Sequence, residues 1–248
     1  MTARGAGDRY ETILNLLGQG IIDGAFPVGS VLPTEQIQED QHVSRTVVRE
    51  ATRTLSTLGL VKAQRNVGTT VLPPSDWATT HPMVIRWRAH GPDFLIQHHE
   101  LLELRLGVEP VAAELSARRA PVDTGAKLME HAAQMGAALR AASPEGFFEA
   151  DSLFHKALLE GSGNAILAKQ AGPVAAGLHA RFESGQEHLR RLIQDSVDRH
   201  VFLAEAVALG DTLMARRWAE MLIRYTLAEV RPARPQAAEV HDGSAAGG

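Results

Sequence analysis

The chain has 248 residues and a formal net charge of −4, from 25 Lys and Arg against 29 Asp and Glu. This length allows one or two domains, each able to bury a core. The absence of cysteine excludes disulfides and thiolate metal sites and fits a cytoplasmic location. We find neither an apolar run of about 20 residues nor a signal-peptide pattern, so we expect no membrane partner. Aromatic residues make up only 5%, which argues against a surface that stacks single-stranded bases.

Residues 1–72 predict a small domain made of helices and one β-hairpin. Apolar residues recur at helical spacing in its helices, and β-branched residues gather in its last two segments. The expected elements are a helix at 8–23, a short helix opening at Ser30 or Thr34, a helix capped by Ser44 and ended by Gly59, and strands at 60–63 and 69–72 joined by a turn at 65–68.

Positive charge concentrates on the second helix of the predicted motif and on the hairpin. Residues 43–65 carry five cations and one anion, a balance of 5 − 1 = +4 in an acidic chain. In a winged helix this helix enters the major groove N-terminus first, where arginine binds guanine or phosphate and hydroxyls bind phosphate. The expected DNA contacts are Ser44, Arg45, Thr46 and Arg49, with Arg65 at the hairpin tip reaching the minor groove and Gly68 allowing a tight turn. By charge alone, a solvated helix with an incidental arginine stripe is an equally good interpretation.

The order of the motifs favours the DNA-binding interpretation. The chain contains Gly-Ser-Val-Leu-Pro-Thr-Glu at 29–35, Val-Ser-Arg-Thr-Val-Val-Arg-Glu-Ala at 43–51, Leu-Gly-Leu-Val at 58–61 and Gly-Thr-Thr-Val at 68–71. These blocks resemble, in order, those of the GntR family of bacterial transcription regulators. The spacing between Glu35 and Ser44 is one residue short of the family pattern. Gln38, Gln41 and His42 replace the usual Ala, aromatic or Leu, and Gly, which leaves Ile37 as the main apolar anchor of that helix.

The rest of the chain predicts a linker with a short helix at 73–92, an all-helical domain at 93–231 and a disordered tail at 232–248. The fold class is therefore mainly α, with an N-terminal winged helix-turn-helix carrying a small β-hairpin and a C-terminal all-α helical bundle. The expected helices of the bundle are at about 93–119, 122–142, 145–160, 164–187, 188–209 and 211–230.

Three residues of the helical domain predict a metal or ligand site. Asp151 and His155 are four apart and share a helix face, and His200 lies on a later helix. One carboxylate and two imidazoles suit a divalent metal such as Zn, Ni or Mn. Arg105, on a largely apolar helix, needs an anion, which is either a glutamate of its own helix (Glu103 or Glu109) or a ligand carboxylate.

Longer patterns in this half resemble the FadR-type effector-binding domain that accompanies GntR winged helices. They are Glu-Leu-Arg-x-x-x-Glu at 103–109, Asp-x-x-Phe-His-x-x-Leu at 151–158, Ser-Gly-Asn-x-x-Leu at 162–167 and His-x-x-x-x-x-Ala-x-x-x-Gly-Asp at 200–211. The resemblance implies that Asp151, His155 and His200 bind a divalent metal. It also implies that a carboxylate effector meets Arg105, the metal residues and Asn164. Many members supply a third histidine where this chain has Leu222, so direct effector binding without metal stays open.

The resemblance implies a homodimeric, ligand-responsive repressor of operator DNA rather than an enzyme. The segment 82–93 looks like that of family members that sense sugar acids, so we expect a small carboxylate such as an aldonate to release the DNA. Two alternatives remain. Asp151, His155 and His200 could belong to a metal-dependent helical-bundle hydrolase or oxygenase acting on small organic acids, or the helical half could serve dimerisation alone.

Overall fold

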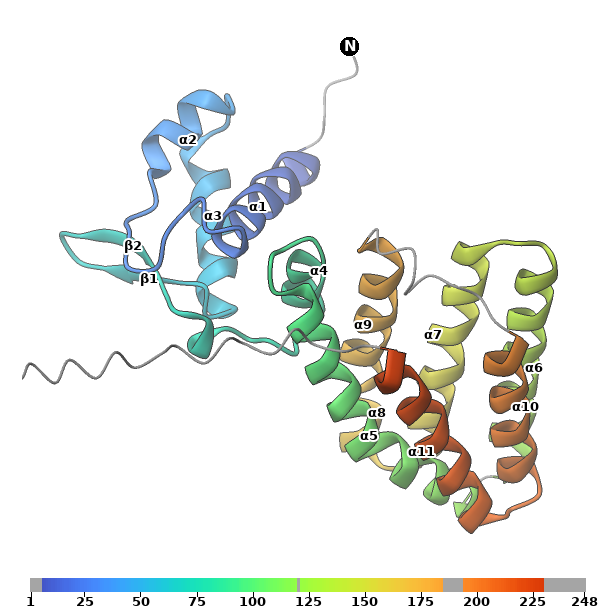
Figure 1. Cartoon of the computed structure of the whole chain (residues 1–248). Helices are drawn as coiled ribbons and strands as arrows, with labels where there is room; N and C mark the ends of the chain where they lie inside the picture. Colours follow the sequence, from blue (N-terminus) through green and yellow to red (C-terminus); the bar gives the residue numbers. More distant parts are fainter. Residues whose placement is uncertain (1–5, 120, 185–193, 230–248) are drawn as a thin grey trace, which may run out of the picture.

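The computed structural model describes residues 6–119, 121–184 and 194–229. Figure 1 shows an N-terminal group of helices with a β-hairpin, a short helix beside it and a bundle of longer helices. The predicted fold class is confirmed by this arrangement. None of the helices in the described ranges is long and apolar enough to cross a membrane. The tail predicted at 232–248 lies outside the described residues.

The N-terminal half is a winged helix. Its elements are α1 (Ala6–Ile22), α2 (Thr34–Asp40), α3 (Arg45–Thr57), β1 (Val61–Gln64) and β2 (Gly68–Val71). The strands pair antiparallel, with Val61 opposite Val71 and Gln64 opposite Gly68. Each observed strand is shifted by one residue from the prediction, because the turn is tightened by Asn66, whose φ is +63°. Gly68 therefore begins β2 instead of closing the turn, which corrects the predicted turn at 65–68.

The apolar faces of α1 and α3 form the core of this half. Leu17 and Leu55 are fully buried there, and Ile37 is the one buried residue of α2. Ser44 is the N-cap of α3 and its side chain accepts a hydrogen bond from the Val47 N–H, as predicted. Gly59, with φ of +76°, follows the last turn of α3. A Cβ at this position would also collide with the carbonyl of Asp76, so both backbone conformation and space favour glycine here.

The C-terminal half is a helical bundle, preceded by a 3-10 turn η1 (Pro74–Asp76). Its helices are α5 (Phe94–Arg119), α6 (Pro121–Arg140), α7 (Pro144–Gly161), α8 (Ala165–Ala168), α9 (Ala171–Glu183), α10 (Gln194–Ala208) and α11 (Thr212–Glu229). The single helix predicted at 164–187 is wrong, because the structure breaks it between α8 and α9. Pro173 has no N–H to continue a helix, and it occupies the first turn of α9, where none is required. Residues 185–193 of the predicted helices lie outside the described part.

The short helix α4 (Pro82–Ala89) belongs to both cores. Its Val84 and Trp87 are buried with the winged-helix residues, whereas Ile85 and Ala89 are buried with residues of α5, α9 and α11. Trp87 Nε1 donates to Asn15 Oδ1 of α1 at 2.9 Å. A Cβ on Gly18 would lie 2.5 Å from the indole, so this glycine lets α1 and α4 approach closely. The segment predicted as linker thus contains the packed joint between the two halves.

Candidate functional site

The N-terminal end of α3 presents the predicted DNA-contacting residues to solvent. Ser44, Arg45, Thr46 and Arg49 are all exposed. Val48, Ala51 and Leu55 bury the opposite face of the helix in the core. No ion pair within the described ranges involves Arg45 or Arg49. The packing of α3 therefore holds the exposed arginines on a rigid helix without neutralising their charge.

The hairpin places a further cation on an exposed tip. Arg65, Asn66 and Val67 form the turn and are exposed. A Cβ at Gly68 would lie 2.8 Å from Val31 Cγ1, and its φ is +116°, so both space and backbone conformation favour glycine. An isolated β-bridge between Val31 and Thr70 links the hairpin to the segment before α2. These contacts fix the direction in which Arg65 is presented.

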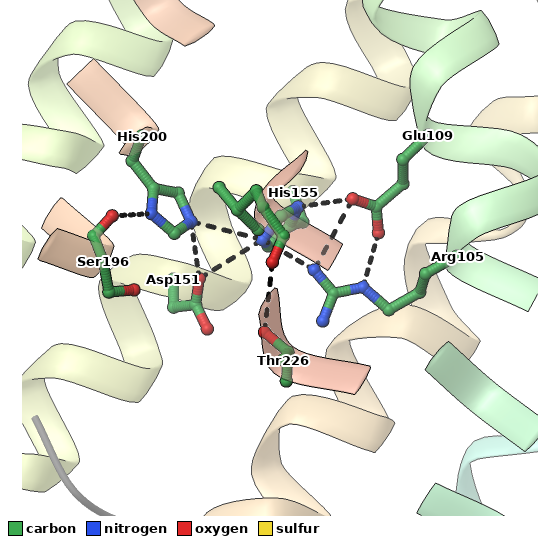
Figure 2. Close-up of polar contacts among 8 residues, drawn as sticks. Arg105, Glu109, Asp151, His155, Ser196, His200 and Thr226 are labelled. Atoms are coloured by element: carbon green, nitrogen blue, oxygen red, sulfur yellow. Dashed lines mark hydrogen bonds and ion pairs between the residues drawn. The ribbon is translucent and has the colours of Figure 1, made fainter. Parts of the chain in front are cut away.

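Inside the helical half, three ligand-type atoms form a compact triangle. Figure 2 shows Asp151 and His155 of α7 facing His200 of α10. Asp151 Oδ1 lies 3.3 Å from His155 Nε2 and 3.1 Å from His200 Nε2, and the two Nε2 atoms lie 3.4 Å apart. Atoms that share one ion at about 2.1 Å, at angles between tetrahedral and octahedral values, lie about 3 to 3.5 Å apart. The three buried residues predicted from the sequence are therefore brought together as a possible metal-binding group.

Oxygen acceptors beside the other ring nitrogens orient both imidazoles. His200 Nδ1 lies 2.7 Å from the Ser196 carbonyl, which can only accept, so Nδ1 carries a proton. His155 Nδ1 lies 2.8 Å from Glu109 Oε2. Metal-binding histidines are commonly held by such acceptors, which turn the Nε2 lone pair towards the ion. Asp151 Oδ1 is buried and faces both Nε2 atoms, which places it as the third possible ligand atom.

Arg105 joins this group through an ion pair on its own helix. Its Nε donates to Glu109 Oε1 at 2.7 Å, and its Nη2 lies 2.8 Å from His155 Nε2. Of the two anion sources that the sequence left open, the structure supplies the intrahelical one. Both side chains are buried, with 7% and 1% of their surfaces exposed. Glu109 thus contacts both Arg105 and His155, one of the possible metal ligands. The sequence analysis missed the contact with His155.

The two buried carboxylates are held in their ionised form. Burial alone would raise the pKa of Glu109, but the charge of Arg105 and the polar contact with the His155 imidazole lower it to about 2. Burial also opposes ionisation of Asp151, and its two imidazole neighbours nevertheless hold its pKa well below the usual range. Both groups therefore carry negative charge at neutral pH.

A small cavity opens beside this cluster. Its volume is about 30 Å³, roughly the space of one water molecule. The lining combines cations with aromatic and polar side chains from several helices: Arg105, Phe147, Phe148, Asp151, His155, Arg181, Ser196, Arg199, His200, Leu222, Tyr225, Thr226 and Glu229. Arg199 lies with its guanidinium carbon 3.7 Å from the Tyr225 ring centre, and its ion-pair contact with Asp195 is long, at 3.8 Å. The cavity therefore suits an anion, although it must widen to admit an organic acid.

The structure does not bring Asn164 into this cluster. Its side chain caps α8, where Oδ1 accepts from the N–H groups of Ile166 and Leu167, and it does not line the cavity. Leu222, at the expected position of a third histidine, does line it. Arg181 and Arg199 were missed by the sequence analysis. Arg181 lies on a largely apolar helix, so the argument that singled out Arg105 would have found it.

An exposed arginine-bearing helix in a winged helix, joined to a helical domain with an arginine-lined cavity, defines a ligand-responsive DNA-binding protein. The comparisons with known proteins agree. Residues 9–71 match the model of the bacterial regulatory proteins of the gntR family, and residues 100–225 match the FCD domain. The chain belongs to the GntR family, with an FCD effector-binding domain, and is a transcription regulator rather than an enzyme.

Individual relatives span most of the chain. It is 29% identical to the transcriptional regulator YieP of Escherichia coli over 84% of this chain and 89% of that protein. It is 28% identical to the galactonate operon transcriptional repressor of E. coli over 83% of this chain and 87% of that protein. Among solved structures, a Listeria monocytogenes protein, Lar, shares the fold with a TM-score of 0.62 at 18% identity, over 89% of this chain and 95% of that one.

Proposed function

We propose that the chain is a homodimeric repressor that binds operator DNA and is released by a small carboxylate, of the sugar-acid class, bound at a divalent metal. The observation that carries this proposal is the buried triangle of Asp151, His155 and His200 beside an arginine-lined cavity. The resemblance to the galactonate operon repressor supports the ligand class. A Zn, Ni or Mn ion would be held by the three ligand atoms and would supply a Lewis acid for carboxylate and hydroxyl oxygens.

At the DNA, Arg45 and Arg49 would read guanines or bind phosphates from the major groove. Ser44 and Thr46 would bind phosphate at the helix N-terminus, and Arg65, positioned by Gly68, would reach the minor groove. These roles are supported by the exposure of Arg45 and Arg49 and by the lack of ion pairs to them from the residues that the structure describes. Two winged helices, one from each protomer, would read the half-sites of a near-palindrome.

At the effector site, an acid must separate residues that now close the cavity. Arg181 of α9 pairs with Glu229 of α11 at 3.4 Å, and Arg199 of α10 covers Tyr225 of α11. A sugar acid is several times larger than the cavity of about 30 Å³, so its entry would move these helices relative to one another. Carboxylate and hydroxyl oxygens can then replace the present partners of the arginines.

The packing supports a route from the cavity to the DNA-binding half through α9 and α4. Ala176 and Ala180 of α9 are buried in one cluster with Ile85 and Ala89 of α4. The same α4 carries Trp87, which packs on Gly18 of α1. A displacement of α9 would therefore reach α1 through directly packed side chains. Only an effector that binds the two geometries with different affinities can shift the equilibrium between them.

The test is a fluorescence-anisotropy titration of the full chain with duplexes from its own upstream region. Metal-stripped and Zn-loaded protein would be compared, with and without galactonate, other aldonates and uronates. We expect operator binding that one of these acids weakens at least fivefold, and only in the loaded protein. If none of the acids changes DNA affinity, the proposed class of effector is refuted. If an acid weakens DNA binding by the metal-stripped protein, the proposed role of the metal is refuted. No binding to any upstream duplex would refute the repressor.

A further inference from the structure

One nitrogen of the buried cluster has two competing partners. His155 Nε2 is a corner of the triangle that suits a metal, and it is also the atom that Arg105 Nη2 approaches to 2.8 Å. Figure 2 shows the guanidinium in contact with both Glu109 and this imidazole, which also contact each other.

An arginine side chain has only donors, so His155 Nε2 must accept the hydrogen bond from Nη2. The proton of the neutral ring then lies on Nδ1, which faces Glu109 Oε2 at 2.8 Å. A neutral imidazole has a single in-plane lone pair. When that lone pair accepts from Arg105, it is not available to a metal.

We propose that Arg105 closes the centre in the metal-free protein by occupying the His155 lone pair, and that Arg105 and a divalent metal exclude each other at this nitrogen. The inference rests on the proposed function, because it concerns the same site. Arg105 thereby acts as a positioning residue that makes the effector site depend on the metal. In the loaded protein, Nη2 no longer has His155 as its acceptor and becomes available to a carboxylate.

Glu109 contacts both of the groups that take part in this exchange. Its Oε1 accepts from Arg105 Nε at 2.7 Å, whereas its Oε2 is 3.5 Å from Nη2 and 2.8 Å from His155 Nδ1. The short Nε contact does not depend on His155, so the guanidinium can leave the imidazole and remain paired. The same carboxylate keeps the Nδ1 proton in place and Nε2 directed at Asp151 and His200. Glu109 is 1% exposed, so water does not compete for either contact.

The two neighbours therefore have opposite effects on metal affinity. Removing the Nη2 donor frees the lone pair, and a buried charge-assisted hydrogen bond changes an equilibrium constant by about tenfold or more. Removing the Glu109 carboxylate loosens the imidazole, and loss of such a partner weakens metal binding by about 10- to 100-fold. A purely structural role for both residues would weaken binding in both variants.

The experiment is calorimetric titration of metal-stripped, full-length protein with Zn²⁺ alone. Arg105→Met is expected to bind about tenfold more tightly than the natural chain, and Glu109→Gln at least tenfold more weakly. Arg118→Met is the matched control, because Arg118 lies exposed on the same helix and pairs with Glu114, away from the cluster. We expect it to leave Zn²⁺ affinity unchanged. Circular dichroism and Tm identify the folded variants.

Arg105→Lys separates competition from simple charge repulsion. Lysine keeps the positive charge and the pairing with Glu109, but its shorter head cannot also reach His155. Competition predicts tighter Zn²⁺ binding, whereas repulsion alone predicts no change. Unchanged or weaker Zn²⁺ binding by Arg105→Lys overturns the inference. This variant therefore decides the question even if Arg105→Met fails to fold. Absence of Zn²⁺ binding by the natural chain would remove the proposed metal centre and this inference with it.

Discussion

The two halves of the molecule place their functional groups in opposite environments. On α3 the arginines are exposed and, in the described structure, without ion pairs, while the opposite face of the helix packs the core. In the bundle Arg105, Glu109, Asp151, His155 and His200 are buried and contact one another. In the first arrangement, the residues that would bind DNA are not the residues that stabilise the fold. The second uses the same contacts for binding and for folding, so a substitution there changes stability and ligand affinity together.

The largest effect is therefore expected in the buried cluster. Glu109→Ala leaves Arg105 buried without its counter-ion and should lower the free energy of unfolding by about 3–5 kcal/mol. Urea denaturation measures the change. Glu103→Ala is the matched control on the same helix, since Glu103 is 63% exposed, and should change stability by no more than about 0.5 kcal/mol. An equal loss of unfolding free energy in the two variants would contradict the stabilising role of the buried cluster.

The complementary variant lies on the exposed helix. Arg49→Ala should weaken operator binding by about 1–3 kcal/mol and leave the free energy of unfolding within about 0.5 kcal/mol. If Arg49 contacts phosphate, the slope of log affinity against log salt should fall by about 1, and if it reads a base, discrimination at one position should relax. Arg118→Ala, on the helical half, serves as control. Unchanged affinity and slope would exclude both contacts.

The sequence predicted the winged helix well because its motifs are local. Ser44 caps its own helix, and Gly59 ends it through backbone conformation, so neighbouring residues determine both. The role of α4 was not predictable in the same way. Trp87 packs on Gly18, 69 positions earlier in the chain, and the helical pattern of α1 does not indicate this contact.

In the helical half, the prediction succeeded where spacing on one helix defined the geometry. Asp151 and His155 share a face, as four-residue spacing requires. The contact between Glu109 and His155 joins α5 to α7, and the closure of the cavity by Arg199 and Tyr225 joins α10 to α11. Such contacts depend on how helices pack, and no local pattern records them. Asn164 shows the converse case, because a residue singled out by its motif alone caps α8 in the structure and lies apart from the cluster.

A smaller effect concerns pH and a buried histidine outside the cluster. Burial, reinforced by the nearby charges of Arg181 and Arg105, lowers the pKa of His98 to about 3. The unfolded chain takes up this proton below about pH 6.5 and the folded chain does not, so stability falls as pH decreases, by up to about 1.4 kcal/mol per unit. His98→Gln should flatten this slope in urea denaturation at pH 7, 6 and 5. Parallel profiles for the two proteins would refute the assignment.

The smallest effect tests whether the winged helix carries its own strain. His42 has φ of +50°, a left-handed conformation, where the family pattern usually has glycine. Its side chain is exposed and accepts no hydrogen bond in the described structure, so nothing evident compensates for the conformation. His42→Gly should raise the free energy of unfolding by up to about 1 kcal/mol, because glycine adopts this region without a steric penalty. His42→Ala, which removes the same side chain but keeps Cβ, should not stabilise the protein. Stabilisation by both substitutions would show that the imidazole, rather than the backbone, is the source of strain.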